Sequence, residues 1–187
     1  MFENLRFETE RLILRPYQVG DLEDLYEIAS DPIIFKYIAE PLATREFAKK
    51  VIDWSIDCMK KNTKEKIFKI NMAIIHKSDN HFIGYCGLGP DDISPEEIEI
   101  YYAIKKEFWG RGLVTEAANE VLKFGFEILE LNKIVTEIHP ENVASIKIVE
   151  KFGMTFVRKQ QGLNEHLKLY EGYETYEVRR ADFKSIK

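Results

Sequence analysis

The chain has 187 residues, of which 45% are hydrophobic, and it carries a formal net charge of −5. This length and apolar content suit one compact domain over residues 1–187 and leave little room for a second. The negative charge argues against non-specific binding to nucleic acid, where a basic surface normally supplies most of the affinity.

The opening segment and the cysteines indicate the compartment. Residues 1–15 alternate charged and apolar side chains and contain no apolar run that could serve as a signal peptide or a membrane span. Cys58 and Cys86 lie far apart without CxxC spacing, which suggests neither a disulfide framework nor a zinc site. The four histidines are scattered without metal-ligand spacing, so no metal is predicted. A cytoplasmic location is expected.

The first half of the chain begins with a strand and two helices. Residues 11–15 predict a strand that Pro16 closes, and Asp21 is expected to cap the helix that follows. A second helix is expected to begin near Thr44. Four of its apolar residues recur at helical spacing and predict a stripe that packs in the core: Phe47, Val51, Trp54 and Cys58.

From residue 67 the apolar residues recur with period two, which predicts a hairpin. Its strands are expected over residues 67–74 and 82–88, with a turn over residues 77–80. An acidic loop then leads into a further strand over residues 97–104. These strands predict a meander.

The second half predicts a strand, helix, strand, helix unit. One helix is expected over residues 115–129, with the small residues Ala117 and Ala118 where a sheet could approach closely. A short strand over residues 133–138 precedes a helix that Asn142 caps and Gly153 ends. Two more strands complete the chain: residues 154–159 and residues 173–179. The order predicts a mixed α+β domain.

Residues 109–115, with the sequence WGRGLVT, connect a predicted strand to a predicted helix. Glycines let the backbone turn tightly and leave N–H groups pointing outward at the helix N-terminus, which forms an anion-binding cradle. Arg111 adds a positive charge, so a pyrophosphate fits this cradle better than a carboxylate. A P-loop would need GxxxxGK[ST], which is absent, and a Rossmann fingerprint would need glycine in place of Thr115. Taken alone, a GxG motif is better explained by a plain glycine turn with an exposed arginine, because short motifs give many false positives.

The residues around this cradle extend the pattern. Residues 99–117, EIYYAIKKEFWGRGLVTEA, resemble the acetyl-CoA motif of the GNAT N-acetyltransferases, and most closely the branch of the RimJ and RimL ribosomal-protein N-terminal acetyltransferases. The segments HPENVAS (139–145) and EKFGM (150–154) are similar to that branch's N-x-x-S segment and closing K-x-G-[FM]. TERLILRP (9–16) is a common opening in these proteins. The three matches stand in the family's order and cover nearly the whole chain.

The resemblance implies a single-domain α+β GNAT-like fold. Its sheet would be mixed, mostly antiparallel, splayed at the acetyl-CoA site and flanked by helices. Acetyl-CoA would be the cosubstrate, and a backbone amide near Ile104 would stabilise the oxyanion of the tetrahedral intermediate. The cofactor-binding residues that follow from the resemblance are Ala103, Ile104, Trp109, Gly110, Arg111, Gly112, Leu113, Val114, Thr115 and Asn142.

Two positions depart from the family pattern. Val114 stands where GNAT proteins usually have a small residue, although it still supplies a backbone amide. The common GNAT tyrosine, which protonates the leaving thiolate, would fall at Val149, so that acid is missing. Ser145 becomes the candidate in its place, while a first-turn helix hydroxyl or a packing residue is the plainer interpretation.

Glu99 is the candidate general base. A primary amine is mostly protonated at neutral pH, so acetyl transfer to it needs a base, commonly reached through one water. Glu99 is on the strand that leads to the cradle, and the resemblance places it where many GNAT enzymes hold a carboxylate. Strand alternation alone would also put Glu97 and Glu99 on the solvent face of an edge strand, and the sequence does not separate the two interpretations.

The predicted function is acetyl-CoA-dependent acetyl transfer to a primary amine by direct attack on the thioester. The resemblance implies a protein or peptide N-terminal amine as acceptor, with a small-molecule amine such as a polyamine, an aminoglycoside or an amino acid as the alternative. An alternative of another class is a non-catalytic acyl-CoA-binding sensor, which would keep the cradle but need no base. No nucleic-acid or membrane partner is expected, and a homodimer is compatible with the sequence.

Overall fold

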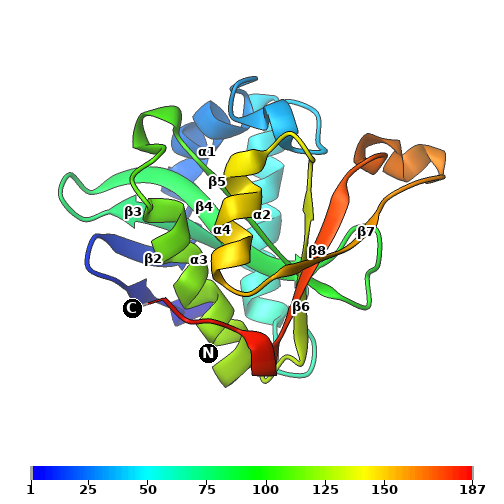
Figure 1. The fold of residues 1–187 in the computed structure, drawn as a ribbon. Coiled ribbons are helices and arrows are strands. Elements are labelled where there is room, and N and C mark those ends of the chain that lie inside the picture. The colour runs from blue at the N-terminus through cyan, green and yellow to red at the C-terminus, as the bar shows by residue number, and fades with distance from the viewer. Residues whose placement is uncertain (1, 187) are drawn as a thin grey trace.

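The computed structural model describes residues 2–186, which form one mixed eight-stranded sheet with helices on both faces (Figure 1). The strand order is β1-β2-β3-β4-β5-β6-β8-β7. The strands are Phe7–Glu8 (β1), Leu12–Pro16 (β2), Ile70–His76 (β3), His81–Pro90 (β4), Ile98–Ile104 (β5), Lys133–Ile138 (β6), Thr155–Lys159 (β7) and Glu174–Arg179 (β8). The helices are Leu22–Ala29 (α1), Arg45–Lys61 (α2), Leu113–Lys123 (α3) and Val143–Lys151 (α4). The predicted α+β class is confirmed.

The sheet is antiparallel at every junction except one. β5 and β6 run parallel, and their register contains a single pair, Glu99 with Val135. Beyond that pair the two strands are not joined, and Figure 1 shows β6 and β8 turned away from the strands of the first half. The predicted splay therefore lies between β5 and β6.

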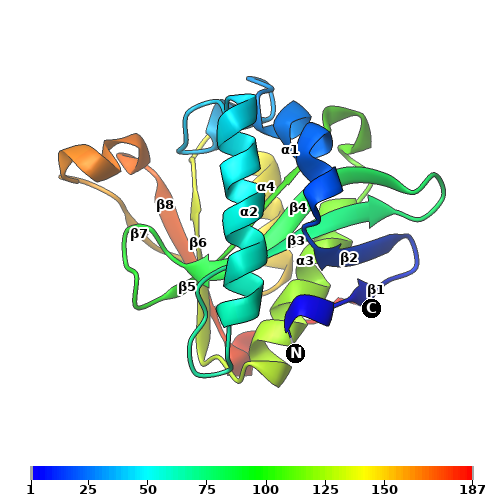
Figure 2. The same cartoon turned by 180° about the vertical axis from the view of Figure 1, so that it is seen from behind.

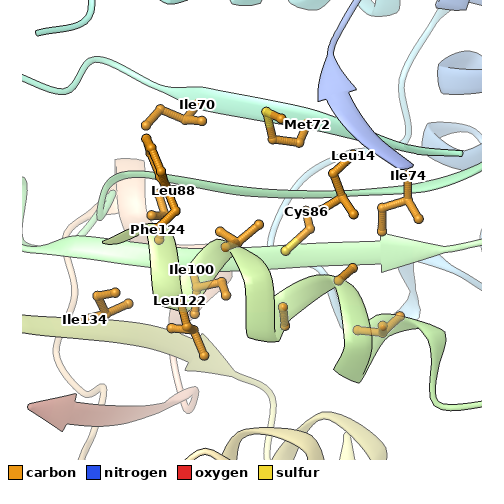
Figure 3. Packing of buried hydrophobic residues seen from close by; sticks show 14 of the residues in the cluster. Leu14, Ile70, Met72, Ile74, Cys86, Leu88, Ile100, Leu122, Phe124 and Ile134 are labelled. Atoms are coloured by element: carbon orange, nitrogen blue, oxygen red, sulfur yellow. The ribbon is translucent and has the colours of Figure 1, made fainter. Parts of the chain in front are cut away.

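The two faces of the sheet carry different helices. α3 and α4 cover one face (Figure 1), and α1 and α2 cover the other (Figure 2). On the α3 face the core is built from the apolar side chains of β2 to β6, packed against α3 and the turn after it (Figure 3). Residues labelled in that view include Leu14, Met72, Leu88, Ile100, Leu122 and Ile134.

α2 begins as predicted but presents a different face to the core. The Thr44 hydroxyl caps the helix by accepting from the amide of Phe47 at 3.1 Å. The predicted core stripe is wrong at Phe47 and Trp54, which are each 50% exposed, and correct at Cys58, which is buried. The other buried residues of α2 are Ala48, Ile52, Ser55 and Met59. The reason is that Phe47 and Trp54 face a cavity beside the sheet rather than the sheet itself.

Asp21 precedes α1, but its side chain does not cap that helix. The carboxylate pairs with the Arg15 guanidinium through two hydrogen bonds of 2.7 Å. It also accepts from the amide of Gln18 at 2.7 Å. A short 3-10 turn, Val19–Asp21, turns the carboxylate back toward β2, so Asp21 ties the start of α1 to the sheet.

α3 differs from its predicted bounds at both ends. It begins at Leu113, because Gly112 adopts a left-handed conformation and serves as the N-cap, and it passes into a π-helical turn over Phe124–Ile128. Ala117 and Ala118 are fully buried against the sheet, as predicted. Within residues 2–186, no helix is both long enough and apolar enough to cross a bilayer.

Candidate active site

The glycine-bearing segment forms an open cradle at the start of α3. Gly110 has φ 72° and Gly112 has φ 74°, values that residues with a Cβ rarely adopt. Among residues 2–186, the first amide of this turn that bonds to a backbone carbonyl is that of Glu116, which donates to Gly112. The preceding amides therefore stay available for an anion. A Cβ at Gly110 would meet nothing within 4 Å, so the space above the cradle is open.

The N-terminal segment holds this cradle in place. Arg11 pairs with Glu116 of α3 at 2.6 Å and donates to the carbonyl oxygen of Arg111 at 2.9 Å. The Thr9 hydroxyl and the Arg11 amide also donate to the Glu116 carboxylate. The opening motif of the chain is thus a clamp on the first turn of α3, a role that its sequence did not reveal.

Trp109 and Arg111 flank the cradle. Trp109 is half exposed and donates from its indole nitrogen to the carbonyl oxygen of Ile104 at 2.9 Å. The guanidinium of Arg111 lies over the ring of Phe108, 5.3 Å from its centre. This stacking keeps a positive charge beside the free amides, which suits a pyrophosphate.

The gap between β5 and β6 leaves main-chain groups of β5 unpaired. The amide of Lys105 donates to the carbonyl of Ile83, so alternation along the ladder directs the main-chain groups of Tyr102 and Ile104 away from β4. β6 no longer pairs with β5 at that level. The main-chain groups of Tyr102 and the amide of Ile104 therefore offer hydrogen bonds to an extended chain such as pantetheine, while the Ile104 carbonyl already accepts from Trp109. Ala103 lies opposite Tyr85 in the β4–β5 ladder.

A cavity of about 630 Å³ lies beside this gap. Its walls come from α1, α2, the loop over residues 35–43, the strands β3 to β6, the start of α4 and the loop before β8. Aromatic side chains form much of the wall, and among them are Phe47, Trp54, Tyr85, Tyr170 and Tyr173. Carboxylates also line it, from Glu40, Asp92, Glu99 and Glu137, with the ammonium groups of Lys50 and Lys69.

Glu99 lies in this cavity at the last point where β5 and β6 are paired. It is 9% exposed and accepts from Lys69 at 3.2 Å. Burial raises the pKa of Glu99 to about 7, Lys69 opposes that shift, and the negative charge of Asp91 adds to it. The interpretation of Glu99 as a solvent-facing residue of an edge strand is wrong, because β5 is a central strand.

Glu137 is a second carboxylate of the cavity, and the sequence pattern did not indicate it as a site residue. One of its oxygens accepts from Thr175 at 2.7 Å and from Gln160 at 3.3 Å. Its Oε2 atom is buried and has no partner among the described residues. Burial raises the pKa of Glu137 to about 7, against the hydrogen bond from Thr175. The one available signal was an acidic residue inside the apolar strand over residues 133–138.

The start of α4 brings two predicted residues to the same cavity. Asn142 caps the helix by accepting from the amide of Ser145 at 3.2 Å, and both residues line the cavity wall. Val149, one turn further on, is 1% exposed within the core. The structure thus brings Glu99, Asn142 and Ser145 together at the cavity, while residues 109–115 form the separate cradle.

Comparison with known proteins identifies the family. Residues 11–155 match the family described as the acetyltransferase (GNAT) domain. The chain is 32% identical over 142 residues to p20 of Bacillus licheniformis, an uncharacterized N-acetyltransferase, which covers 75% of this chain and 77% of p20.

Solved structures show the same fold. A GNAT-family acetyltransferase from Bacillus anthracis superposes with a TM-score of 0.73 at 25% identity, over 95% of this chain and 99% of that one. The ribosomal-protein-S5-alanine acetyltransferase of Vibrio fischeri superposes with a TM-score of 0.75 at 16% identity, over 97% of this chain and 100% of that one. With the cradle and the splayed sheet, these matches lead to one conclusion: the chain belongs to the GNAT acetyltransferases, in the RimJ/RimL-like family, and is an acetyl-CoA-dependent N-acetyltransferase.

Proposed function

We propose that this enzyme acetylates a small primary amine that enters the aromatic cavity, with Glu99 as the general base. The observation that carries the proposal is the position of Glu99. Its carboxylate lines the cavity at the residue pair where β5 and β6 begin to separate, beside the gap suited to the pantetheine chain. The acceptor nitrogen and the thioester would meet there.

The cradle and the gap would hold the donor. The free amides over residues 110–115 and the guanidinium of Arg111 suit the pyrophosphate, and Trp109 borders the same site. The main-chain groups of Tyr102 and Ile104 suit the amides of pantetheine. Asn142, at the start of α4, contributes its side chain where the arm enters the cavity. Acetyl-CoA supplies the activated acyl group.

Glu99 would take the proton that the acceptor must lose. Primary amines have a pKa of about 10 and are mostly protonated at neutral pH. A carboxyl group whose pKa is about 7 is ionised in a large fraction of molecules at that pH, yet it is basic enough to accept a proton. The free amine then attacks the thioester, and a backbone amide near Ile104 stabilises the oxyanion.

The charge of the cavity supports a cationic small molecule as acceptor. Glu137 holds one oxygen buried without a partner, while Thr175 and Gln160 fix the other, so the carboxylate is oriented and ready for a donor. Aromatic walls also favour organic cations. A diamine could place one amine at Glu99 and a second at Glu137.

A protein N-terminus, the acceptor that the family resemblance implies, is the second candidate. The name of the Vibrio fischeri neighbour specifies a ribosomal-protein alanine as its substrate. A peptide end could enter the same cavity with its α-amino group toward Glu99. The sensor alternative is not supported, because the chain belongs to a family of acetyltransferases.

The proposal is tested by thiol release from acetyl-CoA with diamines, uncharged monoamines and short peptides as acceptors. Glu99→Gln is expected to lower kcat on the order of 100-fold with unchanged acetyl-CoA binding by calorimetry, because it removes the base and keeps the shape. Glu97→Gln is the matched control, since Glu97 pairs with Lys133 outside the cavity. Full turnover by Glu99→Gln would assign the base elsewhere.

The acceptor class is tested with Glu137→Gln. This change is expected to raise KM for a diamine roughly tenfold, equivalent to about 1.4 kcal/mol, and to leave KM for a monoamine unchanged. Turnover with peptides but not with diamines would instead favour the protein N-terminus.

A further inference from the structure

The usual proton donor to the leaving group is missing at position 149. Val149 stands on α4 where the family resemblance expects a tyrosine, and it is buried in the core. Ser145, one turn earlier, has an alcohol hydroxyl, which is a much weaker acid than a phenol. A phenol that reaches the same space from another helix or strand would supply the proton that the leaving sulfur needs.

Tyr102 of β5 provides such a phenol. Its side chain packs against the core cluster on the α3 and α4 face of the sheet, and it lines the cavity together with Ser145. Its hydroxyl is buried and has no hydrogen-bond partner among residues 2–186. Burial raises the pKa of Tyr102, and the neighbouring Ser145 hydroxyl opposes that shift.

Two other tyrosines of the cavity wall, Tyr101 and Tyr170, have hydrogen-bond partners for their hydroxyls. The hydroxyl of Tyr101 donates to Asn71 at 2.7 Å, and that of Tyr170 donates to Asp92 at 2.8 Å. A buried hydroxyl without a hydrogen bond of good geometry is unfavourable, and the Ser145 hydroxyl is the group close to that of Tyr102. A bound ligand that accepts a hydrogen bond from Tyr102 would remove this cost.

We propose that the Tyr102 hydroxyl donates a hydrogen bond, and then its proton, to the sulfur that leaves during acetyl transfer. The inference rests on the acetyl transfer proposed above. Tyr102 borders the gap through its own main chain, so its phenol lies next to the path of the pantetheine arm. Ser145, at the start of α4, lies beside the phenol and positions it, and is not itself the acid.

The step balances in atoms and protons. The neutral amine nitrogen forms the C–N bond with the acetyl carbon, and the C–S bond breaks with its electron pair moving to sulfur. Glu99 has by then released the proton of the ammonium group to solvent, so it can take the proton that the nitrogen loses on forming the amide, and sulfur gains one proton from Tyr102. The phenolate recovers its proton from Glu99 through solvent in the cavity, so an amine and a thioester yield an amide and a thiol. The raised pKa keeps Tyr102 protonated before the step begins.

The first test is Tyr102→Phe, which removes one oxygen and keeps the packing ring. We expect kcat to fall roughly 10- to 100-fold. This loss is smaller than that for most general acids, because a thiolate leaves readily without a proton. The dissociation constant of acetyl-CoA should stay within about twofold, since the proposed hydrogen bond forms with the developing thiolate. Tyr176→Phe is the matched control, because Tyr176 lies in the same core cluster but outside the cavity wall.

The second test titrates the thiol of bound CoA through the ultraviolet absorbance of its thiolate. A hydrogen bond to the thiolate lowers the pKa of the thiol, so that pKa should be roughly one unit higher in Tyr102→Phe than in the wild type. Equal thiol pKa values, or an unchanged kcat, would overturn the proposal. This titration needs no acceptor, so it tests Tyr102 even when no amine in the panel is acetylated by the wild type.

Discussion

Glu99 and Glu137 are on the two strands that flank the gap, and burial raises the pKa of both carboxyl groups to about 7. Asp91 adds to both shifts, which indicates that the three carboxylates share one region of negative potential. Lys69 is the cation that pairs with Glu99 there. A site of this kind would favour the positively charged acceptors proposed above, and it holds the pKa of Glu99 near neutral pH.

The pH dependence of turnover follows from Glu99. Because the base must be ionised to accept a proton, kcat is expected to rise with pH through an apparent pKa near 7 and then to level off. The measurement is kcat at a saturating diamine from about pH 5.5 to about pH 9, a range chosen to span that pKa. A profile that is flat through pH 7 in the wild type would contradict this role.

Stability should respond to Glu137 with the opposite trend in pH. Its pKa is higher in the folded chain than its ordinary value of 4.5, so the folded state binds more protons between that value and about 7. The free energy of unfolding therefore falls as pH rises through this window. Glu137→Gln avoids that loss and should melt at a higher temperature than the wild type at pH 8, with the difference vanishing at pH 4.5.

Thermal melts at the two pH values check this expectation. Glu165→Gln, a change at an exposed residue before β8, is the control and should show no such pH-dependent difference. A Glu137→Gln variant that is less stable than the wild type at high pH would show that its hydrogen bonds outweigh the cost of its burial.

The residues of the candidate site differ in how much of their role could be predicted from the sequence. The cradle was predictable because its signal is local: two glycines, an arginine and a helix start within seven residues, 109–115. Glu137 and Tyr102 were not, because their significance is that a buried oxygen lacks a partner. That property depends on groups brought near them by the whole fold, and no spacing along one strand contains it.

At the scale of elements, the N-terminal segment acts on a helix about a hundred residues away. Arg11 and Thr9 bind Glu116 and the carbonyl of Arg111, so the edge of the sheet fixes the turn from which α3 begins. Arg11→Ala is expected to weaken acetyl-CoA binding roughly three- to tenfold, or about 1 kcal/mol, and to leave kcat nearly unchanged. The cradle would still form, but it would no longer be held in one position.

Calorimetric titration of acetyl-CoA measures this effect. Arg6→Ala is the control, since Arg6 pairs with Glu8 at the surface and does not touch the cradle. Equal affinities for Arg11→Ala and the wild type would mean that the cradle is rigid without its clamp.

α2 shows what periodicity does not determine. A helix with apolar residues at helical spacing has one side that avoids water, but the spacing does not say whether that side meets a sheet or a cavity. Here the two largest apolar side chains of the helix, Phe47 and Trp54, border the cavity, while Ile52 and Ser55 meet the sheet. Ser55 can be buried because its hydroxyl bonds to Val51 and Asn71.

At the scale of the whole molecule, the sheet consists of two parts, β1–β5 and β6–β8, joined by a single residue pair. The fold class and the meander of the first half were accessible from alternation and turns, whereas the order β6-β8-β7 of the second half was not. The junction was not, because the point where two parallel strands separate depends on long-range packing; only the family resemblance indicated it.

Amide hydrogen exchange should detect this junction. The amides of Tyr102 and Ile104 face the gap, and binding of acetyl-CoA is expected to slow their exchange because pantetheine supplies acceptors there. Amides in the middle of β3, such as that of Met72, should exchange equally slowly with and without donor. No change at Tyr102 and Ile104 would place the arm elsewhere.

The single residue pair that joins the two parts of the sheet affects how long the folded protein survives as well as its chemistry. A donor that bridges the gap binds the folded chain alone, and at one hundred times its dissociation constant it adds about 2.7 kcal/mol to the free energy of unfolding. Proteases act on opened chains, so digestion of the enzyme should slow as acetyl-CoA becomes abundant. The nutritional state of a cell would then set how long each molecule survives, in addition to how fast it works.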